Sequence, residues 1–258
     1  WEILLDAESG AELHREDRYV NHRSDAVSAS ATGPGPGSGP GSGSGSGSVF
    51  LLNPLSAARR LYGEAGFINN DDAESDSLNR YRAPVILDSL LYVDGLYHLE
   101  GPACTVTQIE YPLDSIRYTS ATPEGFQFTR GEWGFEAVMA YYHVTEAYKR
   151  FTELGFSLAG LRALKVDPHG YQGKDNSHYS PSGNWLAFGT GGVQDAEDAE
   201  VIWHEYAHAI QYNIVPYWGG GETPALGEGY GDYWAASYAR SLSQWQSADP
   251  QYQWIFGW

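Results

Sequence analysis

Two histidines separated by three residues are the first feature of this sequence that can do chemistry. They stand in the segment HEYAH, where His204 and His208 lie about one helical turn apart and so share one face of an α-helix. Both imidazoles can therefore reach one metal ion. Glu205 projects beside that face, where its carboxylate can act on a metal-bound water without being a ligand. The pattern is typical of a zinc hydrolase; the alternative is a structural histidine pair.

Two acidic residues downstream fit the remaining needs of such a site. Glu228 and Asp232 stand four residues apart in GEGYGDY and so share one helical face. Zinc in hydrolases usually takes three protein ligands and leaves the fourth position to water, and two His plus one Glu is one such set. We therefore predict Glu228 as the third ligand and Asp232 as the acceptor for the other ring N–H of His204. The alternative is that both acids decorate a solvated helix start.

HEYAH followed by GEGYGDY resembles the gluzincin metallopeptidases, particularly the thermolysin and fungalysin families, over about residues 131–236. The resemblance implies a zinc ion with Glu205 as general base. It implies three zinc ligands and one supporting carboxylate, which are His204, His208, Glu228 and Asp232. The stretch 175–192 is similar to the substrate-binding edge strand of the thermolysin family, which implies that Asn176 and, beside it, Ser177 bind substrate backbone.

The activity implied by this resemblance is that of a secreted zinc endopeptidase acting on polypeptides. Bound zinc would lower the pKa of its water toward about 7 and polarise the scissile carbonyl. Glu205 would take the proton of that water and pass it to the leaving amine. An exposed edge strand around Asn176 to Phe188 can pair with an extended peptide of any sequence, which favours an endopeptidase over an enzyme that trims chain ends.

One part of the thermolysin-family machinery has no counterpart in this sequence. In that family a histidine from a C-terminal helical lobe helps to stabilise the oxyanion, but no histidine follows Asp232 here. We expect that lobe to be truncated in this chain. Tyr217, which lies between the predicted ligands, is a local oxyanion candidate; the alternative is an ordinary aromatic residue in a Gly-rich loop.

Two other functions remain open. A gluzincin aminopeptidase would share HEYAH, but the Gly-Xaa-Met-Glu-Asn signature that holds the substrate amine in those enzymes is absent, and the single methionine, Met139, lies in VMAY. A non-catalytic surface-binding protein that retains a peptidase lobe would be expected to have lost a site residue, whereas all five are present.

The composition excludes several partners. A formal charge of −18 at pH 7 argues against nucleic acid, and no stretch of eighteen apolar residues could span a membrane. Cys104, the single cysteine, leaves no intrachain disulfide and is expected to be a small buried residue. Calcium is a second candidate ion: the acidic segment Asn69 to Asn79 offers oxygen ligands, although a solvated loop is favoured, and Glu200 corresponds to a calcium-binding acid in the thermolysin family.

The fold expected for these elements is α+β, a zincin-like lobe with a mainly antiparallel sheet. An apolar segment from Val201 to Ile210 predicts a buried active-site helix, and Gly131 to Phe156 has the spacing of a long amphipathic helix. Strand-like runs occupy Pro84 to Ile109 and Trp185 to Phe188.

Composition and resemblance together divide the chain into three parts. Residues 1–31 contain WEILLDAESGAEL, which resembles the last hairpin of the propeptide modules of these families; an edge hairpin of the main domain is the alternative. Residues 32–48 are nearly all Gly, Ser and Pro, which predicts a flexible linker open to an activating cut, and hence a zymogen with its own propeptide as partner. Residues 49–258 are then the catalytic domain, incomplete at its C-terminus.

Overall fold

A computed structural model describes residues 2–5, 12–16, 41–68, 74–113, 118–158, 161, 164–216 and 220–258. The chain forms two compact units, Trp1–Ser30 and Ala31–Trp258. In the first unit, strands β1 (Glu2–Leu5) and β2 (Glu12–Glu16) pair antiparallel. The hairpin expected near the N-terminus is therefore present, and its assignment to a propeptide module stays a prediction.

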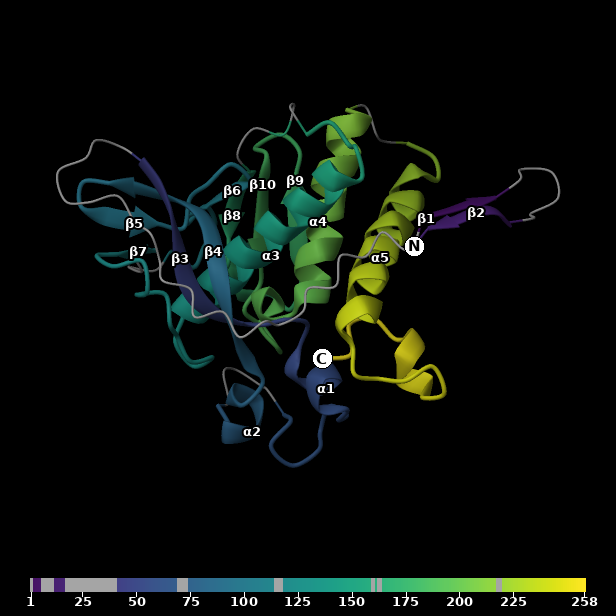
Figure 1. Ribbon diagram of the computed structural model, residues 1–258, viewed down its shortest axis with the longest axis horizontal. Coiled ribbons are helices and arrows are strands. Elements are labelled where there is room, and N and C mark those ends of the chain that lie inside the picture. Colours follow the sequence, from purple (N-terminus) through teal and green to yellow (C-terminus); the bar gives the residue numbers. More distant parts are fainter. Residues whose placement is uncertain are drawn as a thin grey trace. The chain divides into compact units, whose positions relative to one another are not determined.

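Two four-stranded sheets and three long helices make up the second unit (Figure 1). One sheet is antiparallel, in the order β3–β4–β5–β7. Its strands are β3 (Gly41–Phe50), β4 (Arg82–Val93), β5 (Leu96–His98) and β7 (Thr119–Ser120). The other sheet has the order β6–β8–β10–β9, with strands β6 (Cys104–Val106), β8 (Leu164–Asp167), β9 (Ser177–Ser180) and β10 (Trp185–Phe188).

The second sheet mixes both kinds of pairing. Strands β6, β8 and β10 are parallel neighbours, whereas β9 pairs antiparallel with β10 at the edge. Parallel neighbours need a crossover connection, and helix α3 (Gly134–Glu153) lies in the segment that joins β6 to β8. The fold is α+β as expected, and the antiparallel pairing is concentrated in the first sheet and at the edge strand.

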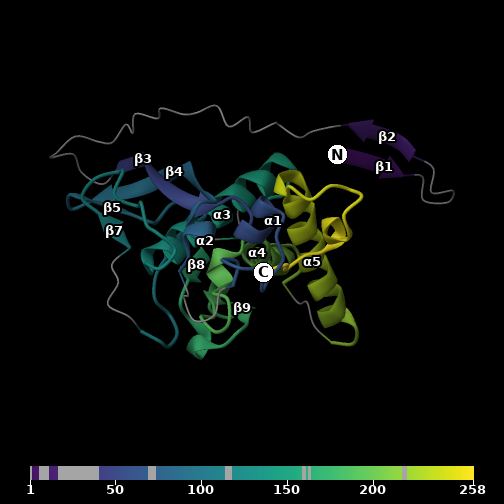
Figure 2. The same cartoon turned by 90° about the horizontal axis from the view of Figure 1, so that it is seen from below.

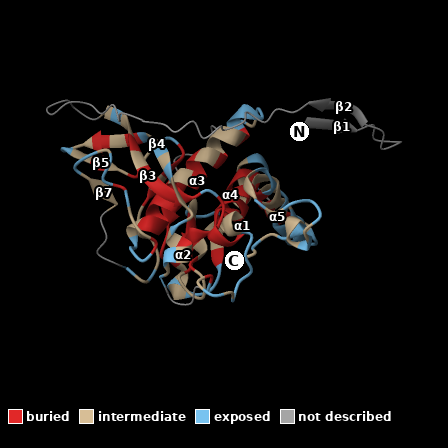
Figure 3. Ribbon diagram, turned by 60° about the horizontal axis from the view of Figure 1, so that its bottom comes forward, coloured by how far each residue is buried: buried red, intermediate tan, exposed pale blue. Residues whose placement is uncertain are grey.

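Helix α3 is the centre of the core. Residues on several of its faces are fully buried, including Phe135, Val138 and Met139, because it packs against both sheets and against helix α4 (Ala199–Ile214) (Figure 3). The amphipathic helix expected at Gly131–Phe156 is thus present and shorter at both ends. Short elements complete the unit: α1 (Pro54–Ala58), α2 (Asp76–Asn79), η1 (Tyr171–Gly173), η2 (Asp195–Glu197) and η3 (Pro250–Gln253). Cys104 is buried with a free thiol, and no described helix could span a membrane.

Helices α4 and α5 (Thr223–Leu242) lie side by side (Figures 1 and 2). Asp198 caps the N-terminus of helix α4, and its side chain accepts the N–H of Glu200. The face of α5 that is buried consists of small residues spaced four apart, which are Gly227, Gly231, Ala235 and Ala239. This spacing lets the two helix backbones approach closely, and Trp203 stacks on Tyr238 at 4.0 Å between ring centroids.

The predicted linker differs from the structure in its second half. Residues 41–48 belong to β3 and pair with β4, so this stretch is not a flexible tether. Its backbone N–H and C=O groups form hydrogen bonds with β4, and its glycines leave room for side chains of the core to approach the strand closely. A Cβ atom on Gly47 would stand 2.7 Å from Val138 Cγ1. Residues 32–40 lie outside the described part.

Candidate metal centre

The two histidines predicted as ligands come from α4, and the predicted third ligand comes from α5. His204 and His208 face α5, and both are largely buried. Glu228, on the first turns of α5, has a side chain that is 65% exposed, so it reaches the histidines from the solvent side. These three residues form a group of potential metal ligands whose donor atoms all lie within 4.8 Å of one another. The structure thus brings together all three residues that the sequence predicts as ligands.

The distances within this group fit a zinc ion. His204 Nε2 lies 3.1 Å from both His208 Nε2 and Glu228 Oε2, and His208 Nε2 lies 3.7 Å from Glu228 Oε2. Zinc bonds of about 2.0–2.1 Å in a tetrahedron place neighbouring ligand atoms about 3.3–3.4 Å apart. The observed separations bracket that value, so the three residues could hold a zinc ion.

Hydrogen bonding to Asp232 orients the ring of His204 and turns its other nitrogen toward Glu228. Asp232 Oδ1 lies 3.0 Å from His204 Nδ1. Because a carboxylate can only accept, Nδ1 must carry the hydrogen, and Nε2 is then a bare acceptor. This acceptor faces the Glu228 carboxylate, another acceptor, and a cation between them would satisfy both. Burial and the neighbouring His204 lower the pKa of His208, which favours the neutral imidazole that binds metals.

Glu205 lies in the environment that a general base of this kind needs. Its side chain is 7% exposed. Burial raises the pKa of Glu205 to about 8, the nearby carboxylates of Glu228 and Asp195 add to the rise, and the backbone N–H of Tyr179 opposes it by donating to the carboxylate. Tyr179 belongs to β9, so the edge strand runs past the Glu205 carboxyl group.

The segment predicted to bind substrate agrees only in part with the structure. Of the stretch 176–188, only β9 is an edge strand, because β10 lies inside the sheet between β8 and β9. Ser177 donates its hydroxyl to Asp195 Oδ2 at 2.6 Å and its backbone N–H to Asn176 Oδ1 at 3.0 Å. Burial raises the pKa of Asp195 to about 6. Binding of substrate by Asn176 and Ser177 stays a prediction, and Tyr217 lies outside the described residues.

Two residues beside His204 were missed by the sequence reasoning. The ring of Phe256 lies 5.6 Å from that of His204, edge to face, and Gly231 of α5 lies directly against the same imidazole. Phe256 is far from His204 in the sequence and carries no local signal. Gly231 could have been noticed, because a glycine in a helix interior is unfavourable and often has a packing reason.

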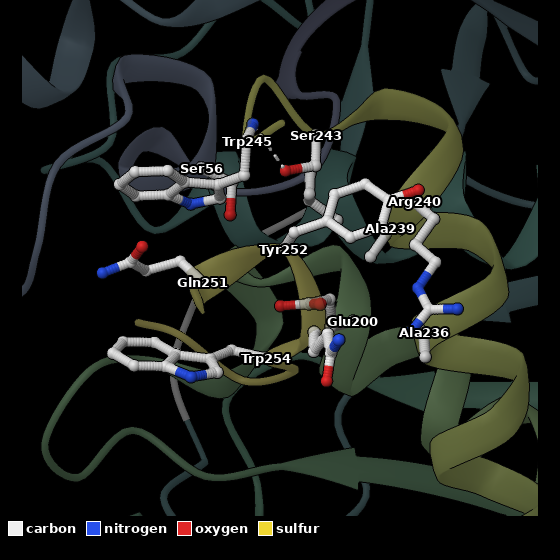
Figure 4. A pocket seen from close by; sticks show the side chains of 12 residues that line it. Ser56, Glu200, Ala236, Ala239, Arg240, Ser243, Trp245, Gln251, Tyr252 and Trp254 are labelled. Carbon is white, nitrogen blue, oxygen red and sulfur yellow. Dashed lines mark hydrogen bonds between the residues drawn. The ribbon is translucent and has the colours of Figure 1, made fainter. Parts of the chain in front are cut away.

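A separate cavity of about 260 Å³ lies beside the C-terminal segment, and the metal ligands do not line it. Figure 4 shows the smaller pocket next to it, whose lining includes Glu200 together with Trp245, Gln251 and Trp254, which lie to one side of it. Glu200 Oε2 accepts the N–H of Phe256 at 3.0 Å and an amide hydrogen of Asn53 at 3.3 Å. Protein N–H groups thus bind the carboxylate expected to hold calcium. Calcium stays a prediction there and at 69–79, of which residues 69–73 lie outside the described part.

Comparison with known proteins gives resemblances to solved structures alone, one of which is the following. No protein-family model matches the sequence, and no curated protein matches it. A solved structure described as the precursor of protealysin, a metalloproteinase from Serratia proteamaculans, resembles this chain with 17% identity and a TM-score of 0.39. The likeness covers 55% of this chain and 45% of that one, so it spans less than half of the Serratia protein. The metalloproteinase activity in that description is a property of the Serratia protein.

Proposed function

We propose that this protein is a zinc-dependent peptidase that cleaves internal bonds of extended polypeptides. The observation that carries this proposal is the convergence of His204 Nε2, His208 Nε2 and Glu228 Oε2 on one point, with a buried Glu205 beside it. A structural histidine pair would need neither the third ligand nor a buried carboxylate like that of Glu205, which forms no salt bridge with any described lysine or arginine. The geometry therefore favours hydrolysis over a purely structural role.

The residues of the site divide the work of peptide hydrolysis between them. Zinc, when bound by His204, His208 and Glu228, supplies a Lewis acid that activates water and polarises the scissile carbonyl. Asp232 keeps the hydrogen of His204 on Nδ1, so Nε2 stays free to ligate. Glu205 accepts the proton of the attacking water and then donates it to the departing amine.

The substrate is expected to bind along β9. An edge strand has unpaired backbone groups, and an extended peptide can add to it as a further strand. Because such pairing needs no free terminus, the enzyme should cleave an N-acetylated, C-amidated peptide as fast as the unblocked peptide. A gluzincin aminopeptidase would cleave only the peptide with a free amine, and this comparison therefore separates the two.

The test of the proposal is the substitution Glu205→Gln, measured for both peptide hydrolysis and zinc content. We expect hydrolysis to fall by at least about 10³-fold while zinc stays bound, since Glu205 is a proton carrier and not a ligand. Glu222→Gln, at the exposed start of α5, is the matched control and should leave both unchanged. Hydrolysis that survives Glu205→Gln would refute the proposal, and a zinc-loaded wild type without hydrolysis would favour the non-catalytic binding protein.

An extracellular location and a propeptide partner belong to the same proposal. Both rest on the resemblance of HEYAH, GEGYGDY and the N-terminal hairpin sequence to secreted peptidases. Sequencing the N-terminus of the active protein secreted by its source would test both at once. A start downstream of the hairpin is expected, and an active secreted protein that retains Trp1 would contradict removal of the propeptide.

A further inference from the structure

Gly231 lies where α5 comes closest to the ring of His204. A Cβ atom on Gly231 would stand 2.8 Å from His204 Nδ1 and Cε1 and 3.0 Å from Cγ. Unbonded carbon atoms attract best at about 3.5–4.0 Å, so no side chain fits at this position while the ring keeps its place. The next residue, Asp232, bonds Nδ1 of the same ring at 3.0 Å. The backbone of α5 and one of its side chains therefore both fix the imidazole.

A second glycine in the same helix lacks such a contact. Gly229 is exposed, and a Cβ atom there would meet nothing within 4 Å. Glycine in a helix interior is unfavourable at either position, so a change to alanine raises helix propensity in both cases. Substitution by alanine at the two positions should therefore differ in its effect on His204, because only Gly231 of this pair contacts the ring.

We propose that Gly231 is a positioning residue for the metal centre: its missing side chain allows α5 to seat the His204 imidazole for ligation. This inference rests on the proposed function. An added methyl group would force either the ring to tilt or α5 to retreat. A tilted ring misdirects Nε2, and a retreat of α5 carries Glu228 and Asp232 away with it. Ligands tolerate displacements of only about 0.5 Å, so either response weakens metal binding.

The test compares Gly231→Ala with Gly229→Ala in the full chain. Zinc affinity is measured by competition with a chelator, and the visible absorption of the Co²⁺-substituted protein reports ligand geometry. We expect Gly229→Ala to match wild type, and Gly231→Ala to bind zinc at least about 10-fold more weakly with an altered Co²⁺ spectrum. Equal affinity and identical spectra for the two variants would overturn the proposal.

A double-mutant cycle, measured as melting temperatures of metal-free protein, tests whether the added methyl group of Gly231→Ala collides with the His204 ring. It does so even if Gly231→Ala is poorly stable. Gly231→Ala is compared in the wild-type background and in His204→Ala, where the ring is gone. The melting temperature should fall in the first background and stay level or rise in the second. An equal fall in both would place the collision elsewhere and overturn the proposal. If wild type and Gly229→Ala bind no zinc, the proposed function fails, while this cycle still decides the contact between Gly231 and His204.

Discussion

At the scale of single residues, the metal centre depends on which nitrogen of His204 carries the hydrogen. Asp232 accepts from Nδ1, so Nε2 is available to a cation. The same carboxylate holds the ring in place from α5, while His208 and Glu228, the other two proposed ligands, both lie 3.1 Å from Nε2. Removing the negative charge of Asp232 should therefore weaken metal binding without removing a ligand.

The substitution Asp232→Asn tests this dependence. We expect zinc affinity to fall about 10–100-fold, because the amide is a weaker acceptor and can present its N–H₂ group to Nδ1. The melting temperature of the metal-free protein should change little, since the Asp232 side chain is 46% exposed. Asp94→Asn is the control, because Asp94 has a φ of 52°, a conformation that asparagine tolerates. Affinity equal to wild type in Asp232→Asn would contradict the role of this carboxylate.

At the scale of elements, β3 shows how a Gly/Ser repeat can form a strand. Glycines occupy the odd positions from Gly41 to Gly47, and serines occupy the even positions, so the two residue types lie on opposite faces. The glycine face lies against Leu87, Leu90 and Val138. The serine face makes hydrogen bonds, such as Ser48 Oγ to the carbonyl oxygen of Phe128 at 3.1 Å. The strand thus allows unusually close packing of α3 and β4.

The substitution Gly47→Ala tests this packing. Its Cβ atom would stand 2.7 Å from Val138 Cγ1 and 3.1 Å from Leu87 Cδ1. Overpacking of this kind costs about 1–3 kcal/mol of unfolding free energy, measured by urea denaturation. Ser42→Ala, at an exposed position of the same strand, should stay within about 0.5 kcal/mol of wild type. If Gly47→Ala is as stable as the control, residues 41–48 are a tether and not a strand.

At the scale of the larger unit, buried carboxylates connect segments that are far apart in the sequence. The Asn53 amide donates to Asp198 and Glu200 over 3.3–3.4 Å, and Glu200 also accepts the N–H of Phe256. No lysine or arginine forms a salt bridge with either carboxylate among the described residues. Burial therefore raises the pKa of Asp198 to about 7 and that of Glu200 to about 9.

These shifts predict that stability falls as the pH rises. Between pH 5 and pH 9 the unfolded chain has lost the Glu200 proton, while the folded protein still holds it and must release it as the pH passes through the folded pKa. The stabilisation that comes from the proton on Glu200 is complete below the pKa of this group in the unfolded chain, and it is lost as the pH rises toward 9. In metal-free protein, Glu200→Gln should lose less stability over this interval than wild type, by at least about 1.4 kcal/mol, the equivalent of one pKa unit. Parallel pH profiles would show that Glu200 does not titrate in this range.

The sequence predicted most of what is local and little of what depends on distant contacts. Helical spacing was sufficient to predict that His204, His208, Glu228 and Asp232 lie close together. Each pair lies within two turns of one helix, and the two helices are neighbours in the chain. The amphipathic pattern likewise predicted α3. The fold class was also predictable, since strand-like runs gather in Pro84 to Ile109, ahead of the long helical segments, and such segregation is typical of an α+β lobe.

Other features depend on tertiary packing. The composition of residues 41–48 favoured a tether, and only the pairing with β4 gives these residues their backbone partners. The contact of Phe256 with His204 joins segments more than fifty residues apart, and the parallel pairing of β6, β8 and β10 depends on crossover connections. No periodicity in the sequence reports such contacts.

The most direct test of the metal centre is the zinc content per chain, determined by elemental analysis of wild type and Glu228→Ala purified side by side. Three converging ligands predict about one zinc per wild-type chain and a sharp loss in the variant, because two histidines alone leave the ion weakly held. Equal zinc in both proteins would show that Glu228 is not a ligand. Folded wild type that binds no zinc, even when zinc is supplied, would contradict the metal centre itself.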